Sequence, residues 1–249
     1  MISGASSGLG LALARHYLKR GAMVAVFARR GELLQPLGIE FPNQVYCYPL
    51  DVRDATAVQH AASDFISRVG CTEVVIANAG VSVGTLTEFA EDIDNFQQLM
   101  DVNVLGMVKT FQPFVAAMRE SGGGILVGVA SVAGFRGLPG ASAYSASKAA
   151  AISYLESLRV ELRNSGIKVV TICPGYIKTP MTIVNPYPMP FILDADEAAR
   201  RIGLAINRQD SFVVIPWQMD LVGRLLKCMP NWLFDRLFVN APRKPRVVA

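Results

Sequence analysis

The chain has 249 residues, of which 51% are hydrophobic and 18% are charged, which is enough apolar sequence for one large buried core. It has no run of about eighteen apolar residues, and its N-terminus lacks the basic start and apolar stretch of a signal peptide, so neither a membrane span nor secretion is expected. The net charge of +4 arises within residues 217–249, and the neutral remainder argues against a nucleic-acid partner.

The four cysteines are far apart, form no CxxC pair, and have only two histidines as possible companions in a metal site. This pattern predicts neither a disulfide framework nor a bound metal. We therefore expect a cytoplasmic protein whose thiols are buried in its core.

Short β-branched runs alternate along the chain with longer segments of helical period. This alternation predicts repeated βα units, and hence a single α/β domain over 1–249 with a Rossmann-type, doubly wound parallel sheet between two helical layers. Runs of this kind are typical of strands buried on both faces. Strands are predicted at 24–27, 45–48, 74–77, 125–129, 169–172 and 212–215, and helices at 9–19, 55–68, 96–118, 144–163 and 196–206.

A glycine loop with the sequence SGASSGLG occupies residues 3–10, with the GxxxGxG spacing between a strand stub and a helix start. Only residues 1–3 remain to form the first strand, so either that strand is truncated or upstream residues are absent. Such a loop lets the backbone approach a pyrophosphate while the helix N-terminus presents amide N–H groups, although a small-residue turn before any helix would look similar. The residues predicted to contact a dinucleotide here are Gly4, Ser6, Ser7, Gly8, Leu9 and Gly10.

Three further motifs follow in order: AlaAsnAlaGly at 77–80, a YxxxK pair at Tyr144 and Lys148, and ProGly at 174–175. With the glycine loop they resemble the short-chain dehydrogenase/reductase family, in its single-domain form of about this length, over residues 3–180. The resemblance implies a nicotinamide cofactor and hydride transfer between it and a carbonyl or secondary alcohol carbon.

The cofactor preference is predicted from Ala28, Arg29 and Arg30 at the end of the second strand. Family members that prefer NAD commonly have an aspartate at the position of Ala28, where it repels a 2′-phosphate. Arg29, with Arg30 as a second candidate, can instead bind that phosphate through charge-assisted hydrogen bonds worth about 1.5 to 3 kcal/mol each. The alternative is a pair of solvated surface arginines. We favour NADP(H).

The resemblance assigns further cofactor contacts. Asp51 and Val52 match an adenine-contacting pair, although an N-cap on the next helix explains an aspartate equally well. The family usually has a second asparagine where this chain has Ala77. The remaining implied contacts are Asn78, Ala79 and Gly80 beside the cofactor, and Pro174, Gly175, Ile177 and Thr179 near the nicotinamide.

The catalytic set implied by the resemblance is Asn103, Ser131, Tyr144 and Lys148. A spacing of four places Tyr144 and Lys148 on one face of a helix, and Ser131 follows a strand at the ligand-binding end of the sheet. Reduction of a carbonyl needs a proton donor, and a tyrosine with a pKa of about 10 serves only if a lysine ammonium and an oxidised nicotinamide lower it. Tyr144 is thus the expected acid, Lys148 tunes it and binds the nicotinamide ribose, and Ser131 holds the substrate oxygen. Each residue alone has an ordinary structural explanation.

Asn103 matches the asparagine that distorts a long helix in the family and whose backbone holds a proton-relay water. A routine buried hydrogen bond is the alternative.

Residues 180–193 match the variable substrate lid and are rich in proline and apolar side chains. With Ser131, the expected substrate contacts are Met181, Tyr187 and Met189, and they indicate a small hydrophobic ketone or aldehyde. These side chains serve equally well to pack the loop down.

Residues 217–249 form a basic C-terminal extension with two amphipathic segments, 219–229 and 232–239, followed by ArgLysProArg. Such an end can lie peripherally on an anionic membrane, or pack over the pocket or against a second subunit of a homo-oligomer, which is the expected state. The alternative to an enzyme is a non-catalytic NADP(H)-binding regulatory or membrane-surface protein on the same fold.

Overall fold

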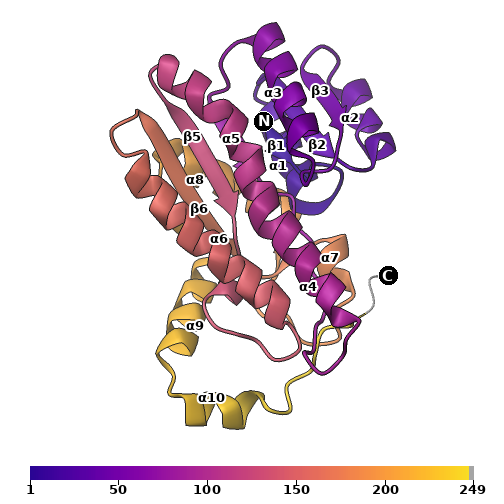
Figure 1. Cartoon of the computed structure of the whole chain (residues 1–249), viewed down its shortest axis with the longest axis vertical. Helices are drawn as coiled ribbons and strands as arrows, with labels where there is room; N and C mark the ends of the chain where they lie inside the picture. Colours follow the sequence, from indigo (N-terminus) through magenta and orange to yellow (C-terminus); the bar gives the residue numbers. More distant parts are fainter. Residues whose placement is uncertain (247–249) are drawn as a thin grey trace.

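The computed structural model describes residues 1–246 and has a seven-stranded sheet at its centre (Figure 1). The strand order is β3-β2-β1-β4-β5-β6-β9, and every neighbouring pair runs parallel. The predicted Rossmann-type α/β fold is therefore confirmed. The strands are β1 (Ile2–Ser3), β2 (Val24–Ala28), β3 (Val45–Pro49), β4 (Val74–Ala77), β5 (Gly124–Val129), β6 (Ile167–Pro174) and β9 (Phe212–Ile215).

Strand side chains alternate between two hydrophobic clusters. In β2, Phe27 packs into the cluster on one face, and its neighbour Val26 packs into the cluster on the other. Both are fully buried, as expected for a strand covered on two sides. The edge strands β3 and β9 are only partly buried, so the expectation of full burial is wrong for them because each has one neighbour rather than two.

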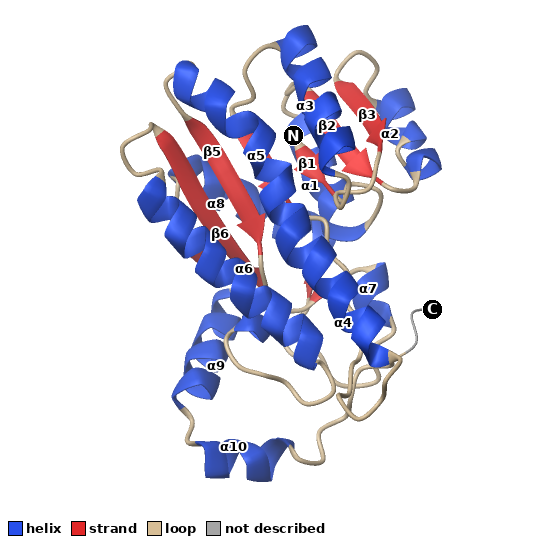
Figure 2. Cartoon of the chain, in the orientation of Figure 1, coloured by secondary structure: helices blue, strands red, loops and turns tan. Residues whose placement is uncertain are grey.

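Helices cover both faces of the sheet (Figure 2). One layer contains Leu13 and Ile202, and the other contains Phe111 and Leu155, all fully buried. The first layer consists of α1 (Gly8–Leu18), α2 (Gln35–Glu40) and α8 (Ala195–Arg208), and the second of α3 (Ala55–Val69), α5 (Gly106–Glu120) and α6 (Ser142–Glu161).

The helix predicted as one segment over 96–118 is divided, so that prediction is wrong in detail. Helix α4 (Asp92–Met100) leads into a π-helical segment, η2 (Asp101–Leu105), which leads into α5. The fully buried Asn103 lies in this segment and makes its side-chain bonds outside the helix. A π-helical segment of this kind is common at functional sites.

Several short elements have no periodic sequence signal and were not predicted. They lie in the connections that follow β2, β5 and β6. They are the 3₁₀ turns η1 (Gly31–Leu33) and η3 (Val132–Gly134), helix α7 (Pro180–Ile183), and the paired strands β7 (Ile177–Lys178) and β8 (Leu193–Asp194), along with α2.

The C-terminal extension forms α9 (Trp217–Cys228) and α10 (Asn231–Phe238), and the chain then returns toward the start of α4 (Figure 1). Arg136 fastens the turn between these helices, donating to the Leu226 carbonyl at 2.6 Å and to Asn231 Oδ1 at 2.9 Å.

Within residues 1–246, no helix is both long and apolar enough to cross a membrane. Only Cys173 of the four cysteines is buried, so the expectation of buried thiols is wrong for the others.

Candidate active site

A cavity of about 270 Å³ opens among the loops that follow the parallel strands. Doubly wound sheets bind ligands at this end. Every residue predicted to contact the cofactor lines it, as do Ser131 and Met181. Asn103, Tyr187 and Met189 lie outside its lining.

The glycine loop is shaped for the approach of a phosphate. Gly4 and Gly8 have φ values of +71° and +54°, which side chains rarely adopt. A Cβ at Gly4 would lie 2.7 Å from the Ala79 Cα, and one at Gly10 would meet the Gly4 carbonyl oxygen and the Asn78 amide. Ser7, the N-cap of α1, makes no side-chain cap bond, and the first turn has no acidic residue. The helix N-terminus is therefore available to an anion, and the site fits a dinucleotide pyrophosphate.

Asn78 joins the end of β4 to this loop. Its side-chain Nδ2 donates to the carbonyl oxygens of Ser3 at 3.0 Å and of Gly4 at 3.3 Å. The backbone N–H groups of Asn78 and Ala79 both donate to Ser3 Oγ at 3.1 Å. Two loops that meet the same cavity are thus held in fixed relation.

Arg29 and Arg30 are exposed at the adenine end of the cavity as the resemblance places it. Asp51 lies on the same side, where its carboxylate accepts from the Arg53 backbone at 2.9 Å and from the Arg53 guanidinium at 2.8 Å. Partial burial acts to raise the pKa of Asp51, but the bonds from Arg53 lower it below its ordinary value. The N-cap explanation for Asp51 is wrong, because α3 begins later and Asp54 caps it, accepting from Ala57 N–H at 3.0 Å.

Tyr144 and Lys148 lie one turn apart on α6 beside Ser131. Lys148 is 4% exposed, and its Nζ donates to the Val129 carbonyl at 2.9 Å and lies 5.9 Å from the centre of the Tyr144 ring. Burial lowers the pKa of Lys148 to about 8. Burial also raises the pKa of Tyr144, while the Ser131 hydroxyl acts to lower it. The predicted lowering of the tyrosine pKa is therefore absent in the protein alone, where desolvation outweighs the hydrogen bond from Ser131.

Ser131 lies two residues after β5 and is the N-cap of η3. Its Oγ accepts from Ala133 N–H at 3.2 Å and donates to the Pro174 carbonyl at 3.4 Å. The long second bond leaves the hydroxyl free to turn toward another oxygen.

Asn103 positions groups around the cavity rather than lining it. Its Oδ1 accepts from Val81 N–H at 2.9 Å, and its Nδ2 donates to the Val81 carbonyl at 3.1 Å and to Ser147 Oγ at 2.9 Å. Asn103 thereby ties the loop after β4 to α6, the helix of Tyr144 and Lys148. The expected helix distortion coincides with Asn103, and the expected buried hydrogen bonds are present as well.

The lid residues differ in position. Met181 lines the cavity from α7, 38% exposed. Tyr187 packs against Tyr176 with ring centres 6.4 Å apart, and the Met189 sulfur accepts from Asn185 Nδ2 at 3.5 Å. One of the three substrate contacts expected from the lid thus lines the cavity, and the other two pack within the lid.

Residues that were not predicted also reach this region. Val81 and Val102 line the cavity, and Lys244 comes from the C-terminal tail to within 5.8 Å of the centre of the Tyr144 ring. The only sequence signal for Lys244 is its place in the basic ArgLysProArg segment, which indicates a solvated end as readily as a site.

Comparison with known proteins agrees with this geometry. Residues 1–186 match the family model described as short chain dehydrogenase. The chain is 40% identical over 238 residues to an "Uncharacterized oxidoreductase" of Myxococcus xanthus (strain DK1622), covering 94% of each chain. It is 34% identical to the "2-dehydro-3-deoxy-L-rhamnonate dehydrogenase (NAD(+))" of Sphingomonas sp. (strain SKA58), covering 73% of this chain and 72% of that protein.

Among solved structures, a short chain dehydrogenase from Burkholderia cenocepacia J2315 in complex with NADP superposes with a TM-score of 0.82. The two chains are 29% identical, and the match covers 94% of each. The family model spans most of the chain, and the relatives that match it over nearly their full length are oxidoreductases. The chain therefore belongs to the short-chain dehydrogenase family, oxidoreductases that act on alcohol and carbonyl groups.

Proposed function

We propose that the protein is an NADP(H)-dependent reductase of hydrophobic ketones or aldehydes. The observation that carries this proposal is that two arginines, the glycine loop and the Ser131, Tyr144 and Lys148 set all line one cavity. A nucleotide spanning that cavity would have its phosphates at the loop and its reactive end beside the tyrosine.

NADP(H) is favoured over NAD(H) by the electrostatics of the adenine end. Ala28 has no charge to repel a 2′-phosphate, and Arg29 and Arg30 extend from the next two positions. The carboxylate of Asp51 is engaged by Arg53, which reduces its repulsion of an incoming phosphate. The Burkholderia cenocepacia neighbour was solved with NADP, whereas the Sphingomonas relative is named for NAD(+), so the proposal of NADP(H) rests on this chain's own residues.

The protein's own groups supply the proton and the orientation. When bound, the nicotinamide supplies the hydride and, once oxidised, a positive charge. The Ser131 hydroxyl donates to the substrate carbonyl oxygen and stabilises the charge that develops there. Tyr144 then gives its phenolic proton to the same oxygen. Lys148, whose ammonium donates to the Val129 carbonyl in the protein alone, would hold the nicotinamide ribose.

The experiment is NADPH oxidation by the purified protein against a panel of small, aromatic, long-chain and steroidal ketones and aldehydes, with NADH in parallel. We expect turnover with NADPH that is lost in Tyr144→Phe while NADPH binding is kept. Near-normal turnover by Tyr144→Phe would overturn the mechanism. Tight NADPH binding without turnover on any substrate would instead favour the non-catalytic, cofactor-binding alternative.

A peripheral membrane role is a second candidate, which one observation favours. Trp217, Leu221 and Leu225 are 64%, 60% and 65% exposed and recur every fourth residue on α9, and Trp232 on α10 is 70% exposed. Cations occur on the same two helices, which suits an anionic lipid surface. A second copy of the chain would cover the same residues.

Liposome sedimentation and ultracentrifugation together distinguish an anionic membrane from a second copy of the chain as the partner of this surface. Binding to phosphatidylserine vesicles that is lost in Trp217→Ser together with Leu221→Ser would support the membrane role. A concentration-dependent dimer by ultracentrifugation, without vesicle binding, would support the subunit interface.

A further inference from the structure

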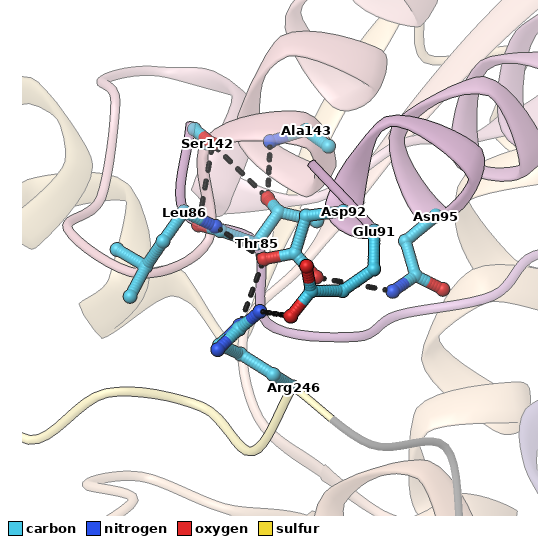
Figure 3. Close-up of polar contacts among 8 residues, drawn as sticks. All are labelled: Thr85, Leu86, Glu91, Asp92, Asn95, Ser142, Ala143 and Arg246. Atoms are coloured by element: carbon cyan, nitrogen blue, oxygen red, sulfur yellow. Dashed lines mark hydrogen bonds and ion pairs between the residues drawn. The ribbon is translucent and has the colours of Figure 1, made fainter. Parts of the chain in front are cut away.

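The C-terminal tail passes beside Tyr144 and is fastened at several points to the loop after β4 and the start of α4. Gly84 N–H donates to the Pro245 carbonyl at 2.7 Å. Arg246 donates from Nε to Asp92 at 2.8 Å and from its terminal nitrogen to Glu91 at 3.0 Å (Figure 3), and its guanidinium lies 3.5 Å from the centre of the Phe89 ring. The tail is therefore held by backbone, charge and ring contacts together.

The receiving side of this contact is itself rigid. Asp92 is 4% exposed and also accepts from Leu86 N–H at 2.8 Å (Figure 3). The neighbouring Thr85 hydroxyl pairs with Ser142 at 3.0 Å and accepts from Ala143 N–H at 3.1 Å. These bonds connect the tail's anchor to the start of α6, immediately before Tyr144, so the tail has a fixed position relative to the tyrosine.

Lys244 is the residue that this arrangement delivers to the site. Its Nζ donates to Ser82 Oγ at 2.7 Å and lies 5.8 Å from the centre of the Tyr144 ring. The side chain is half-buried, and among residues 1–246 no carboxylate lies within ion-pair distance of it. The carboxylates of Asp92 and Glu91 on the facing loop are already paired with Arg246.

A half-buried ammonium with only a neutral hydroxyl as partner is costly to keep charged, and burial accordingly lowers the pKa of Lys244 to about 8. An anion placed beside it would offset that cost. Two of the three ammonium protons remain for such a ligand once Ser82 has taken one.

We propose that Lys244 is a substrate-binding residue that recognises a carboxylate, so that the protein reduces keto acids with an apolar body. This rests on the reductase function proposed above and names its substrate class. The carbonyl oxygen is held at Ser131 and Tyr144, the apolar body lies against the lid at Met181, and the carboxylate pairs with Lys244. The sequence places Lys244 in a basic C-terminal segment, but in the structure its ammonium lies beside Tyr144.

The test compares substrates that differ only in the acidic group. Medium-chain α-, γ- and δ-keto acids, each paired with its methyl ester, are assayed with NADPH in the wild type and in Lys244→Met, Lys244→Arg and Arg243→Met. Arg243→Met is the matched control, because Arg243 is exposed and its loss removes the same charge from the same tail. Thermal unfolding checks that each variant is folded.

We expect the wild type to prefer a keto acid over its ester by about ten- to a hundredfold in kcat/KM, the range of one charge-assisted bond. Lys244→Met should lose that preference because its KM for the keto acid rises while its KM for the ester stays unchanged. Lys244→Arg should keep part of the preference, and Arg243→Met should behave as the wild type.

The pH dependence provides a second readout. Tyr144 of α6 faces Lys244 and has a raised pKa, Asp92 and Glu91 of the facing loop are paired with Arg246, and Glu88 of that loop is exposed. Lys148, on the other side of Tyr144, also has a pKa of about 8, so both lysines change charge near that pH, and the comparison with Lys244→Arg isolates Lys244 because Lys148 is kept. KM for the acid should rise above pH 8 more steeply in the wild type than in Lys244→Arg, whose guanidinium remains charged.

An equal loss for acid and ester in Lys244→Met, or a wild type indifferent to the acidic group, would overturn the proposal. If no compound oxidises NADPH, the reductase function itself fails, and the anion site is then judged by calorimetric titration of the same keto acids into the NADPH-bound protein. Binding that Lys244→Met weakens at least tenfold, but Arg243→Met does not, would support the site. Equal binding by all variants would refute it.

Discussion

Replacement of Asn103 by alanine should destabilise the protein and loosen the site. The side chain is fully buried and makes three hydrogen bonds, two to Val81 and one to Ser147. With about 1 kcal/mol lost for each bond, the free energy of unfolding should fall by about 3 kcal/mol. For a chain of this size, that corresponds to a fall in Tm of about 6 to 12 °C. The turnover number should fall as well, because the loop after β4 loses its tie to α6.

Urea unfolding followed by circular dichroism measures the stability change, and NADPH oxidation measures the second effect. Asn95→Ala is the matched control, since Asn95 is half-buried and makes one long bond, 3.3 Å, to Asp92. We expect that control to lose less than about 1 kcal/mol. A loss in Asn103→Ala no larger than in Asn95→Ala would refute the view that this residue connects the loop to the helix.

Three further substitutions test the cofactor site and the buried lysine. Arg29→Ala should weaken NADPH binding by about ten- to a hundredfold and spare NADH; an equal loss for both, in fluorescence titrations, would contradict the phosphate role. Gly10→Ala should abolish binding of both cofactors, because its Cβ would meet the Gly4 carbonyl oxygen, whereas Gly38→Ala, with open space, should bind normally. Lys148 is buried with a pKa of about 8, below its unfolded value, so its charged form costs stability below pH 8 and that cost declines from pH 8 to 10.5. Relative to Lys148→Met, the wild type should gain about 1.4 kcal/mol of stability per pH unit in that window, and parallel stability curves would count against it.

The sheet was predictable because its signal is periodic. Buried parallel strands are short apolar runs, and the six predicted ones match the observed strands to within two residues at each end. The glycine loop and the YxxxK pair were likewise visible as fixed local spacings. The residues that they predict line one cavity.

The features that the sequence did not predict depend on local packing and on contacts between residues that are distant in the sequence. Nothing around Lys244 indicates that it faces Ser82, 162 positions away, because that contact exists only once the tail is fastened to Asp92. The capping role of Asp51 was misjudged because two aspartates precede α3 and the sequence does not say which one the first turn uses. The lid positions of Tyr187 and Met189 are set by local packing in a loop without periodicity.

The π-helical segment η2 has a consequence for how α4 and α5 are related. One extra residue in a helical turn rotates everything after it by about 100° relative to an uninterrupted α-helix. Helix α4 can therefore contact α6 while α5 contacts α3 and β4, although the two follow each other directly. Removal of any single residue from 101–105 would restore a regular helix and at the same time turn one of these helices off its partners. Away from Asn103 and the buried, cavity-lining Val102, this stretch should tolerate substitution. It should tolerate no deletion, because its number of residues sets the orientation of α5 relative to α4.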